Sequence, residues 1–184
     1  MKTLITERLI LRKFRESDLD DFYEYAKNPR VGPNAGWRPH ESKEVSFDIL
    51  KMFIENNDVW AITDKNTGKV IGSIGLHIDR KRNNDNVRML GYVLSEDYWG
   101  KGLMTEAARE VIRYAFEDMG LDLISVYHYP SNIRSKRVIE KCGFQYEGTL
   151  KRASVIFNGN IYDDVCYSLT REDYRKKVKE NSTG

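Results

Sequence analysis

Two glycines, Gly100 and Gly102, lie at a point in the chain where an anion could bind. The apolar run from Met89 to Leu94 is typical of a strand, and helical periodicity begins directly after Gly102. Glycine lacks a Cβ atom, so it adopts the unusual dihedrals of a tight turn and lets a ligand approach the backbone. The first amides of a helix have no intrahelical partner and lie at the positive end of its dipole. The stretch therefore predicts a phosphate-binding turn, and the alternative is a plain tight turn before a helix.

Two well-known nucleotide loops fit this stretch poorly. The phosphate loop that ends in Gly-Lys-Ser or Gly-Lys-Thr is absent, because Gly102 and Leu103 follow Lys101. The dinucleotide fingerprint would need glycine or alanine at Thr105 and an acidic residue where Tyr129 closes the next strand. A nucleotide-dependent enzyme is therefore the least favoured of the functions considered.

A second stretch with chemical potential runs from Asn132 to Phe144. Asn132 is typical of a helix N-cap, and Gly143 is typical of the residue that follows a helix end. Ser135 adds a hydroxyl in the first turn of the expected helix. For Asn132, a simple cap and a ligand contact both remain open.

These stretches belong to a longer pattern of strands and helices. We expect strands over residues 6–12, 59–63, 70–78, 87–94 and 123–129, then a hairpin that turns at Asn158-Gly159. We expect helices capped by Ser17, starting at about Ser42, running from Leu103 to Met119, and following Asn132. Because a helix separates strands 87–94 and 123–129, those two should run parallel through a right-handed crossover. The pattern predicts a mixed α/β (α+β) fold.

Composition narrows the class of protein. The chain has 184 residues with 30 basic and 28 acidic side chains, and a net charge of +2 argues against non-specific nucleic-acid binding. No apolar run approaches membrane-spanning length, and Cys142 and Cys166 have no metal-ligand or redox spacing. We expect no metal site, no membrane association and a cytoplasmic location. Residues 1–175 are expected to form one domain, and residues 176–184 a polar, partly disordered tail.

The residues from Trp99 to Ala107 read WGKGLMTEA, which resembles the acyl-CoA loop of the GCN5-related N-acetyltransferase (GNAT) superfamily. The closest pattern is that of the RimJ/RimL-type branch, which acetylates ribosomal-protein N-termini, and Met104 is the one departure from it. The opening of the chain, the stretch from Asn132 to Phe144 and the ending after Asn158 also resemble this branch. The resemblance implies a mixed, mostly antiparallel, twisted sheet of about seven strands. It also implies helices on both faces and a splayed parallel strand pair that holds the pantetheine arm of the cofactor.

The resemblance implies that acetyl-CoA is the cofactor. The residues that it assigns to cofactor binding are Tyr92, Val93, Leu94, Trp99, Gly100, Lys101, Gly102, Leu103, Met104, Thr105, Asn132, Ser135 and Lys136. A backbone amide near Tyr92 to Leu94 is expected to polarise the thioester carbonyl.

The catalytic residues follow from the same resemblance, with two departures. Many superfamily members place a tyrosine proton donor where Ile139 stands, and in the RimJ/RimL-type branch a serine corresponding to Ser135 takes its place. A thiol has an ordinary pKa of about 8.5, so a hydroxyl is sufficient to stabilise the leaving group. The glutamate that often serves as base is replaced by Met89. The remaining candidates are Glu147, His77, Asp163 and Asp164.

The predicted function is acetyl-CoA-dependent N-acetylation of a primary amine, first of all a protein N-terminal α-amine. A polyamine or an aminoglycoside is the alternative acceptor, and a catalytically silent CoA-binding module is the alternative of a different class. Trp37 and His40 are candidate acceptor contacts, and a surface loop held by a half-buried tryptophan is the other interpretation. We also expect a homodimer, as is common in this branch.

Overall fold

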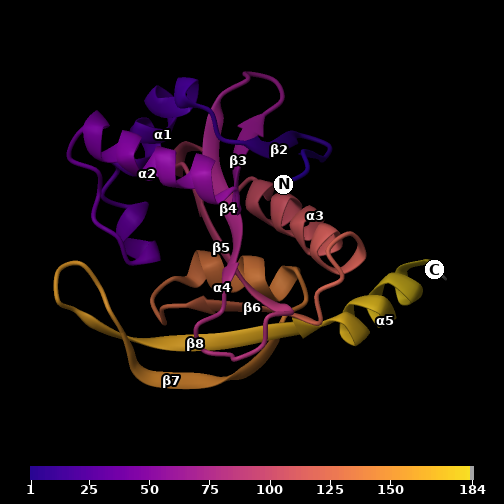
Figure 1. Ribbon diagram of the computed structural model, residues 1–184. Coiled ribbons are helices and arrows are strands. Elements are labelled where there is room, and N and C mark those ends of the chain that lie inside the picture. Colours follow the sequence, from indigo (N-terminus) through magenta and orange to yellow (C-terminus); the bar gives the residue numbers. More distant parts are fainter. Residues whose placement is uncertain (183–184) are drawn as a thin grey trace.

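The protein is built on one sheet with strand order β1-β2-β3-β4-β5-β6-β8-β7, seen in the computed structural model, which describes residues 1–182 (Figure 1). Its strands are β1 (Leu4–Ile5), β2 (Leu9–Lys13), β3 (Val59–Asp64), β4 (Val70–Ile78), β5 (Val87–Leu94), β6 (Leu123–His128), β7 (Gln145–Val155) and β8 (Ile161–Thr170). All neighbouring pairs are antiparallel except β5 and β6. The mixed sheet is confirmed, with eight strands instead of about seven. The additional strand is β1, whose two residues are too few to show a periodicity.

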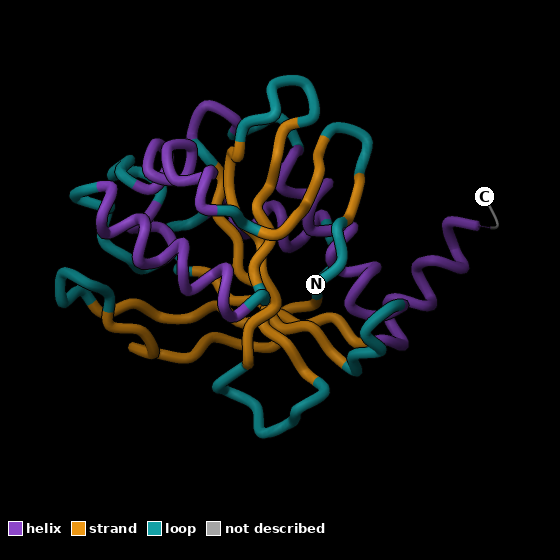
Figure 2. Tube along the Cα trace, turned by 45° about the horizontal axis from the view of Figure 1, so that its top comes forward, coloured by secondary structure: helices purple, strands orange, loops and turns teal. Residues whose placement is uncertain are grey.

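Helices cover both faces of the sheet, as expected (Figure 2). They are α1 (Leu19–Ala26), α2 (Lys43–Asn56), α3 (Leu103–Glu117), α4 (Ile133–Lys141) and α5 (Arg171–Ser182), with 3-10 turns at Glu16–Asp18, Gly32–Ala35 and Glu96–Tyr98. On one face, α1 and α2 pack through an apolar cluster that includes Phe14, Phe22 and Leu50. On the other face, α3 and α4 contribute to the larger core. Ala107 and Ala108 are fully buried there, and such small side chains let α3 approach the sheet closely.

The first helix begins differently from the sequence prediction. Ser17 was expected to cap it, but a 3-10 turn precedes α1 and Asp18 occupies the N-cap position. The Asp18 carboxylate accepts a hydrogen bond from the Arg15 amide at 2.8 Å and pairs with both terminal nitrogens of Arg12 at 2.8 Å. The Ser17 prediction is therefore wrong, because a buried ion pair between neighbouring elements fixes Asp18 at this position.

The parallel strands β5 and β6 separate, as the resemblance to the GNAT superfamily implied. β5 and β6 pair only from Val87 to Met89 against Leu123 to Ser125. Beyond these residues β5 continues to pair with β4 on its other side, as far as Leu94. The edge of β5 that faces β6 is thus left open, and the splayed pair is confirmed.

The end of the chain is more ordered than predicted. Thr170 caps α5, because its hydroxyl oxygen accepts from the Asp173 amide at 3.1 Å. The helix then continues to Ser182, through residues that we predicted to be a partly disordered tail, while residues 183–184 lie outside the described part. Tyr174 stacks on Phe116 of α3 with ring centroids 5.1 Å apart. This contact attaches the helix to the domain. No helix within residues 1–182 has the length and apolar character needed to cross a membrane.

Candidate active site

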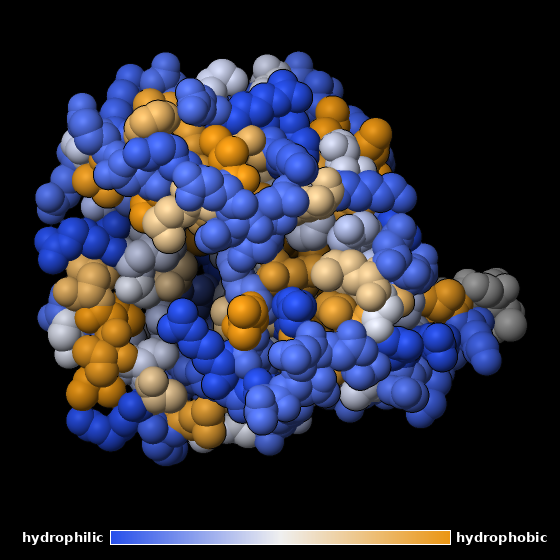
Figure 3. All heavy atoms as spheres, viewed as in Figure 1, coloured by the Kyte–Doolittle hydropathy of each residue, from blue (hydrophilic) through white to orange (hydrophobic). Residues whose placement is uncertain are grey.

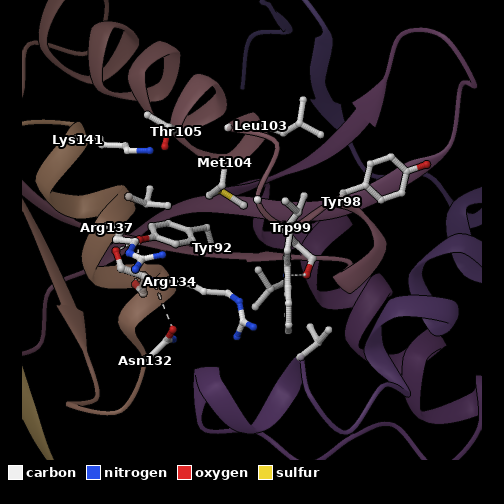
Figure 4. Close-up of a pocket in the computed structure, with 17 residues that line it drawn as sticks. Tyr92, Tyr98, Trp99, Leu103, Met104, Thr105, Asn132, Arg134, Arg137 and Lys141 are labelled. Carbon is white, nitrogen blue, oxygen red and sulfur yellow. Dashed lines mark hydrogen bonds between the residues drawn. The ribbon is translucent and has the colours of Figure 1, made fainter.

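Two adjoining cavities, each of about 330 Å³, lie where β5 and β6 separate. The helix-end cavity lies against the N-terminal turns of α3 and α4 (Figure 4) and is lined by Val31, Tyr92, Val93, Leu94, Tyr98, Trp99, Gly100, Gly102, Leu103, Met104, Thr105, Asn132, Arg134, Ser135, Arg137, Val138 and Lys141. The strand cavity lies between the splayed strands and is lined by Asn34, Ala35, Lys81, Met89, Leu90, Gly91, Tyr92, Val126, Tyr127, His128, Tyr129, Asn132, Ser135, Ser154 and Asp164. Tyr92, Asn132 and Ser135 belong to both. Figure 3 shows a hollow in the surface between the regions of α2 and α4.

The glycine turn leads into α3 with its first amides available. Gly100 and Gly102 have φ angles of +74° and +76°, a conformation that favours glycine. Gly102 is the N-cap of α3, and no side chain caps it. A Cβ atom at Gly100 would meet nothing within 4 Å, so the approach to the turn is open. The positive end of the helix therefore faces the helix-end cavity without a protein partner.

The N-terminal segment holds this turn in place. One oxygen of the Glu106 carboxylate accepts from the Thr6 hydroxyl at 2.6 Å and from the Arg8 amide at 2.8 Å, and the other accepts from Arg8 Nε at 2.7 Å. Arg8 Nη1 also donates to the carbonyl of Lys101 at 2.9 Å. Burial alone would raise the pKa of Glu106, but the hydrogen bonds from Thr6 and Arg8 outweigh it and lower the pKa. Glu106 is therefore a charged anchor for the turn.

Basic side chains of α4 supply positive charge to the same cavity. Arg134, Arg137 and Lys141 line it from one face of the helix. The Arg134 guanidinium lies 4.2 Å from the ring centroid of Trp99, and Trp99 Nε1 donates to the carbonyl of Leu94 at 2.8 Å. None of these three cations was predicted from the sequence as a site residue. Arg137 follows Arg134 by three residues and Lys141 follows Arg137 by four, a spacing that places all three on one helical face.

Of the predicted cofactor residues, all but Lys101 and Lys136 line the helix-end cavity. Lys101 Nζ donates instead to the carbonyl of Asp97 at 2.8 Å. Lys136 points away and lies 3.8 Å from Glu140 on the exposed side of α4. The structure thus brings the predicted residues together around one cavity, except for these two lysines. The positive charge at this cavity comes from Arg134, Arg137 and Lys141 instead.

Two hydroxyl groups meet where the cavities join. Tyr92 Oη lies 2.9 Å from Ser135 Oγ and 3.3 Å from the carbonyl of Ser135. Burial raises the pKa of Tyr92 above its ordinary value, so the phenol keeps its proton. Asn132 holds Ser135 in position, because its Oδ1 accepts from the Ser135 amide at 3.1 Å while its Nδ2 donates to the carbonyl of Asn34 at 3.2 Å. The N-cap role of Asn132 is therefore confirmed.

The predicted bases Glu147 and His77 line neither cavity. Glu147 accepts from the Ser168 hydroxyl at 2.6 Å and forms an ion pair with Arg82. His77 Nδ1 lies 3.3 Å from Asp58 Oδ2. Trp37 and His40 also lie outside both cavities and pack against each other with ring centroids 5.2 Å apart. For Trp37, this geometry favours a tryptophan-held loop over an acceptor contact.

The turn after β4 contributes to two ion pairs, Asp79 with Arg82 and Lys81 with Asp164. Asp79 is only 2% exposed, and its oxygens accept from Ser125 Oγ at 2.7 Å, Tyr127 Oη at 2.7 Å and Arg82 Nη1 at 2.8 Å. A backbone amide donates to it as well, at 2.9 Å. The second pair joins Lys81 Nζ to Asp164 Oδ2 at 2.8 Å, and both of its residues line the strand cavity.

Asp79→Asn is expected to lower the free energy of unfolding by about 2 kcal/mol, because it leaves buried donors without an acceptor. Burial would raise the pKa of Asp79, but its hydrogen bonds lower it below the ordinary 3.8. A carboxyl group with a lowered folded-state pKa stabilises the fold above its unfolded pKa and loses that contribution as the pH falls through its folded pKa. Urea unfolding should therefore show a difference between the variant and the natural protein at pH 7 that shrinks below about pH 4. Asp48→Asn, which removes one partner of an exposed pair with Lys51, is the matched control and should change little.

Comparison with known proteins agrees with this geometry. The resemblance to the GNAT superfamily implied a splayed strand pair, and the structure has one, with the uncapped N-terminus of α3 beside it. The chain matches the model of the acetyltransferase (GNAT) domain over residues 8–145, and it belongs to that family. It is therefore an acetyl-CoA-dependent N-acetyltransferase, and the resemblance seen in its motifs is confirmed.

Three similar proteins illustrate the range of the family. The uncharacterized N-acetyltransferase p20 of Bacillus licheniformis is 31% identical over 183 residues, which cover 95% of this chain and 99% of p20. The crystal structure of ribosomal-protein-S5-alanine acetyltransferase from Vibrio fischeri is 27% identical, with a TM-score of 0.76 over 94% of this chain and 98% of the other. The microcin C7 self-immunity acetyltransferase MccE, solved with acetyl-CoA and AMP, shares the fold at 22% identity, with a TM-score of 0.75 over 89% of this chain and 93% of its own.

Proposed function

We propose that this enzyme acetylates a protein N-terminal α-amine, with acetyl-CoA in the helix-end cavity and the acceptor in the strand cavity. The observation that carries the proposal is the meeting of the two cavities at Tyr92, Asn132 and Ser135. A donor and an acceptor that enter from opposite sides would bring their reacting groups together at this point. Positioning of this kind contributes several kcal/mol to a two-substrate reaction.

The helix-end cavity fits the charge of the cofactor. The open amides at the start of α3 suit a pyrophosphate, and Arg134, Arg137 and Lys141 add three positive charges. Among the described residues that line this cavity there is no carboxylate. The open edge of β5 beyond Met89 leaves backbone groups available for the amides of a pantetheine arm.

Acetyl-CoA supplies a thioester from which the acetyl group is transferred to the amine. We assign the Ser135 and Tyr92 hydroxyls to the leaving sulfur, because they are the paired donors at the junction of the cavities. A backbone amide on the open edge near Leu94 is assigned to the carbonyl oxygen. Glu147 and His77 receive no role, since each is engaged elsewhere.

The chemistry of the strand cavity favours an α-amine over a polycation. An α-amine has an ordinary pKa of about 8 and is roughly one-tenth neutral at pH 7, whereas a lysine-like amine of pKa about 10.4 is almost wholly charged. A polyamine or an aminoglycoside would be recognised by several carboxylates, but Asp164 is the one carboxylate among the described residues of the cavity. The similarity to the ribosomal-protein-S5-alanine acetyltransferase of Vibrio fischeri supports a protein acceptor.

The proposal is tested by following release of the CoA thiol with four kinds of acceptor. We expect release with peptides that begin with alanine or serine, and none with the same peptides blocked by N-terminal acetylation. Faster release with spermidine or kanamycin would replace the proposed acceptor class with a small-molecule one. Calorimetric binding of acetyl-CoA without release on any amine would favour a silent CoA-binding module.

We place the reaction in the cytoplasm and expect a homodimer. The free cysteines Cys142 and Cys166 support a reducing compartment. The exposed edge strand β7 carries Tyr146 and Leu150 at its surface, which suits an interface between copies. Cell fractionation and light scattering test these two points, and a monomer at micromolar concentration would contradict the second.

A further inference from the structure

We propose that Asp164 is the receptor for the ammonium group of the acceptor, and that Lys81 occupies this carboxylate until the acceptor displaces it. The inference rests on the proposed function, since it takes the strand cavity as the acceptor site. It adds the charge of the acceptor and the residue that recognises it.

Asp164 has the properties of a buried receptor for a cation. It lies on β8 and is 3% exposed, yet it lines the strand cavity. Its Oδ1 accepts from the Ser154 hydroxyl at 2.7 Å, and its Oδ2 is paired with Lys81 at 2.8 Å. A carboxylate has about four acceptor positions, so Asp164 retains capacity for further donors. A buried carboxylate is stable only with a cation beside it. Exchanging one ammonium group for another therefore costs far less free energy than leaving Asp164 without a partner.

The Lys81 ammonium is well suited to leave. Its side chain is 33% exposed, on a turn at the rim of the cavity. The ammonium lies 4.5 Å from the ring centroid of Tyr127, so the ring can retain it after it leaves Asp164. The neighbouring pair of Asp79 and Arg82 differs, because Asp79 is fully engaged by several donors and lines neither cavity. The two ion pairs therefore have separate roles. The pair of Asp79 and Arg82 is structural, whereas in the pair of Asp164 and Lys81 the cation can be exchanged.

The exchange defines the class of acceptor. An incoming ammonium replaces the Lys81 ammonium one for one, and no covalent bond changes in this step. Asp164 is the one carboxylate among the described residues of the cavity, so the cavity accepts one positive charge rather than several. An N-terminal α-ammonium with an uncharged first side chain meets this requirement. The bound ammonium lies in the cavity that ends at Ser135 and Tyr92, and it releases one proton to solvent before its nitrogen attacks the thioester carbonyl.

The test is a titration of the CoA-bound protein with the tetrapeptide amide Ala-Ala-Ala-Ala, read by calorimetry. Lys81→Met removes the resident cation, and we expect it to lower the Kd of the peptide by about threefold or more. Asp164→Asn removes the receptor, and we expect the Kd to rise by roughly tenfold or more. In the double variant the Lys81 substitution should bring no gain, because the carboxylate that it frees is absent. The affinity for CoA should be unchanged in all three variants.

The controls use the neighbouring pair of Lys151 and Asp163, which is more exposed and lines neither cavity. Lys151→Met and Asp163→Asn should leave the Kd of the peptide within about twofold. Weaker binding in Lys81→Met would show that Lys81 itself contacts the acceptor, and would overturn the exchange. Unchanged binding in both Lys81→Met and Asp164→Asn would overturn it as well.

The experiments distinguish a failure of the proposed function from a failure of this inference. If the natural protein binds CoA and the peptide but releases no thiol from acetyl-CoA, the acetylation of α-amines is wrong while the exchange remains measurable by binding. If thiol is released and the variants bind the peptide as the natural protein does, the function stands and the exchange is wrong. Circular dichroism and thermal unfolding of Asp164→Asn and the double variant separate a loss of binding from a loss of fold.

Discussion

Replacing Gly102 by aspartate is expected to weaken acetyl-CoA binding by at least about tenfold, which corresponds to about 1.4 kcal/mol or more. The new carboxylate would stand at the N-terminus of α3, where we propose that the pyrophosphate binds. It would repel the phosphates, and it would compete for the same amides as an N-cap side chain. The measurement is a calorimetric titration with acetyl-CoA at moderate salt, because screening reduces the repulsion.

Two further glycine variants separate charge from backbone strain. Gly102 has a φ of +76°, so any side chain there is strained by about 1 kcal/mol or more. Gly102→Ala introduces the strain without the charge, and its added Cβ would have Arg8 at 3.6 Å as its nearest neighbour. Gly68→Asp introduces the same charge at a similar φ of +72° in the turn before β4. Both should retain most of the affinity, and an unaltered affinity in Gly102→Asp would refute the assignment of the loop.

Replacing Ser135 by alanine is expected to lower kcat by roughly 100-fold, the lower end of the range for general acid catalysis. We expect the lower end of this range because the thiol of CoA has an ordinary pKa of about 8.5, so its thiolate can leave without help from a strong acid. The substitution removes the hydroxyl that lies 2.9 Å from Tyr92 Oη at the junction of the cavities. The Kd of acetyl-CoA should change by less than about threefold, because most of its proposed contacts lie elsewhere in the helix-end cavity.

The matching variants are Tyr92→Phe and Ser131→Ala. Tyr92→Phe removes the partner hydroxyl and should produce a smaller decrease in kcat, with non-additive effects in the double variant because the two groups act together. Ser131 lies in the turn just before α4 and lines neither cavity, so its substitution should leave kcat unchanged. A rate equal to that of the natural enzyme in Ser135→Ala would remove Ser135 from the mechanism.

Much of the fold was predictable because its signals are local. The strands 70–78 and 87–94 were predicted with their observed bounds, since each combines apolar periodicity with flanking turn residues. The hairpin at Asn158-Gly159 and the helix end at Gly143 follow from turn chemistry in the same way. β1 was missed because it is only two residues long. The length of helix α5 was also missed, because the helix is held by the contact between Tyr174 and Phe116, which are far apart in the chain.

The candidate site was predictable in part. The glycine turn and Ser135 were identified because each lies in a contiguous motif. Arg134, Arg137 and Lys141 were missed, because only the packing of α4 decides which of its faces borders the cavity. Glu147 and His77 were considered as bases from their residue types alone, and the structure engages both in contacts outside the cavities.

From its own residue pattern the chain specifies the sequence of strands and helices, the glycine turn at Gly102 and the caps at Asn132 and Gly143. These features depend on backbone dihedrals and hydrogen bonds between residues a few positions apart, so they can be read without knowledge of the fold. Tertiary structure decided which side chains meet. Tyr92 comes together with Ser135, and Lys81 with Asp164, only because β8 pairs with β6 and α4 packs beside the splayed strands. Contacts between residues this far apart in the chain depend on the packing of the whole domain, which no short motif encodes.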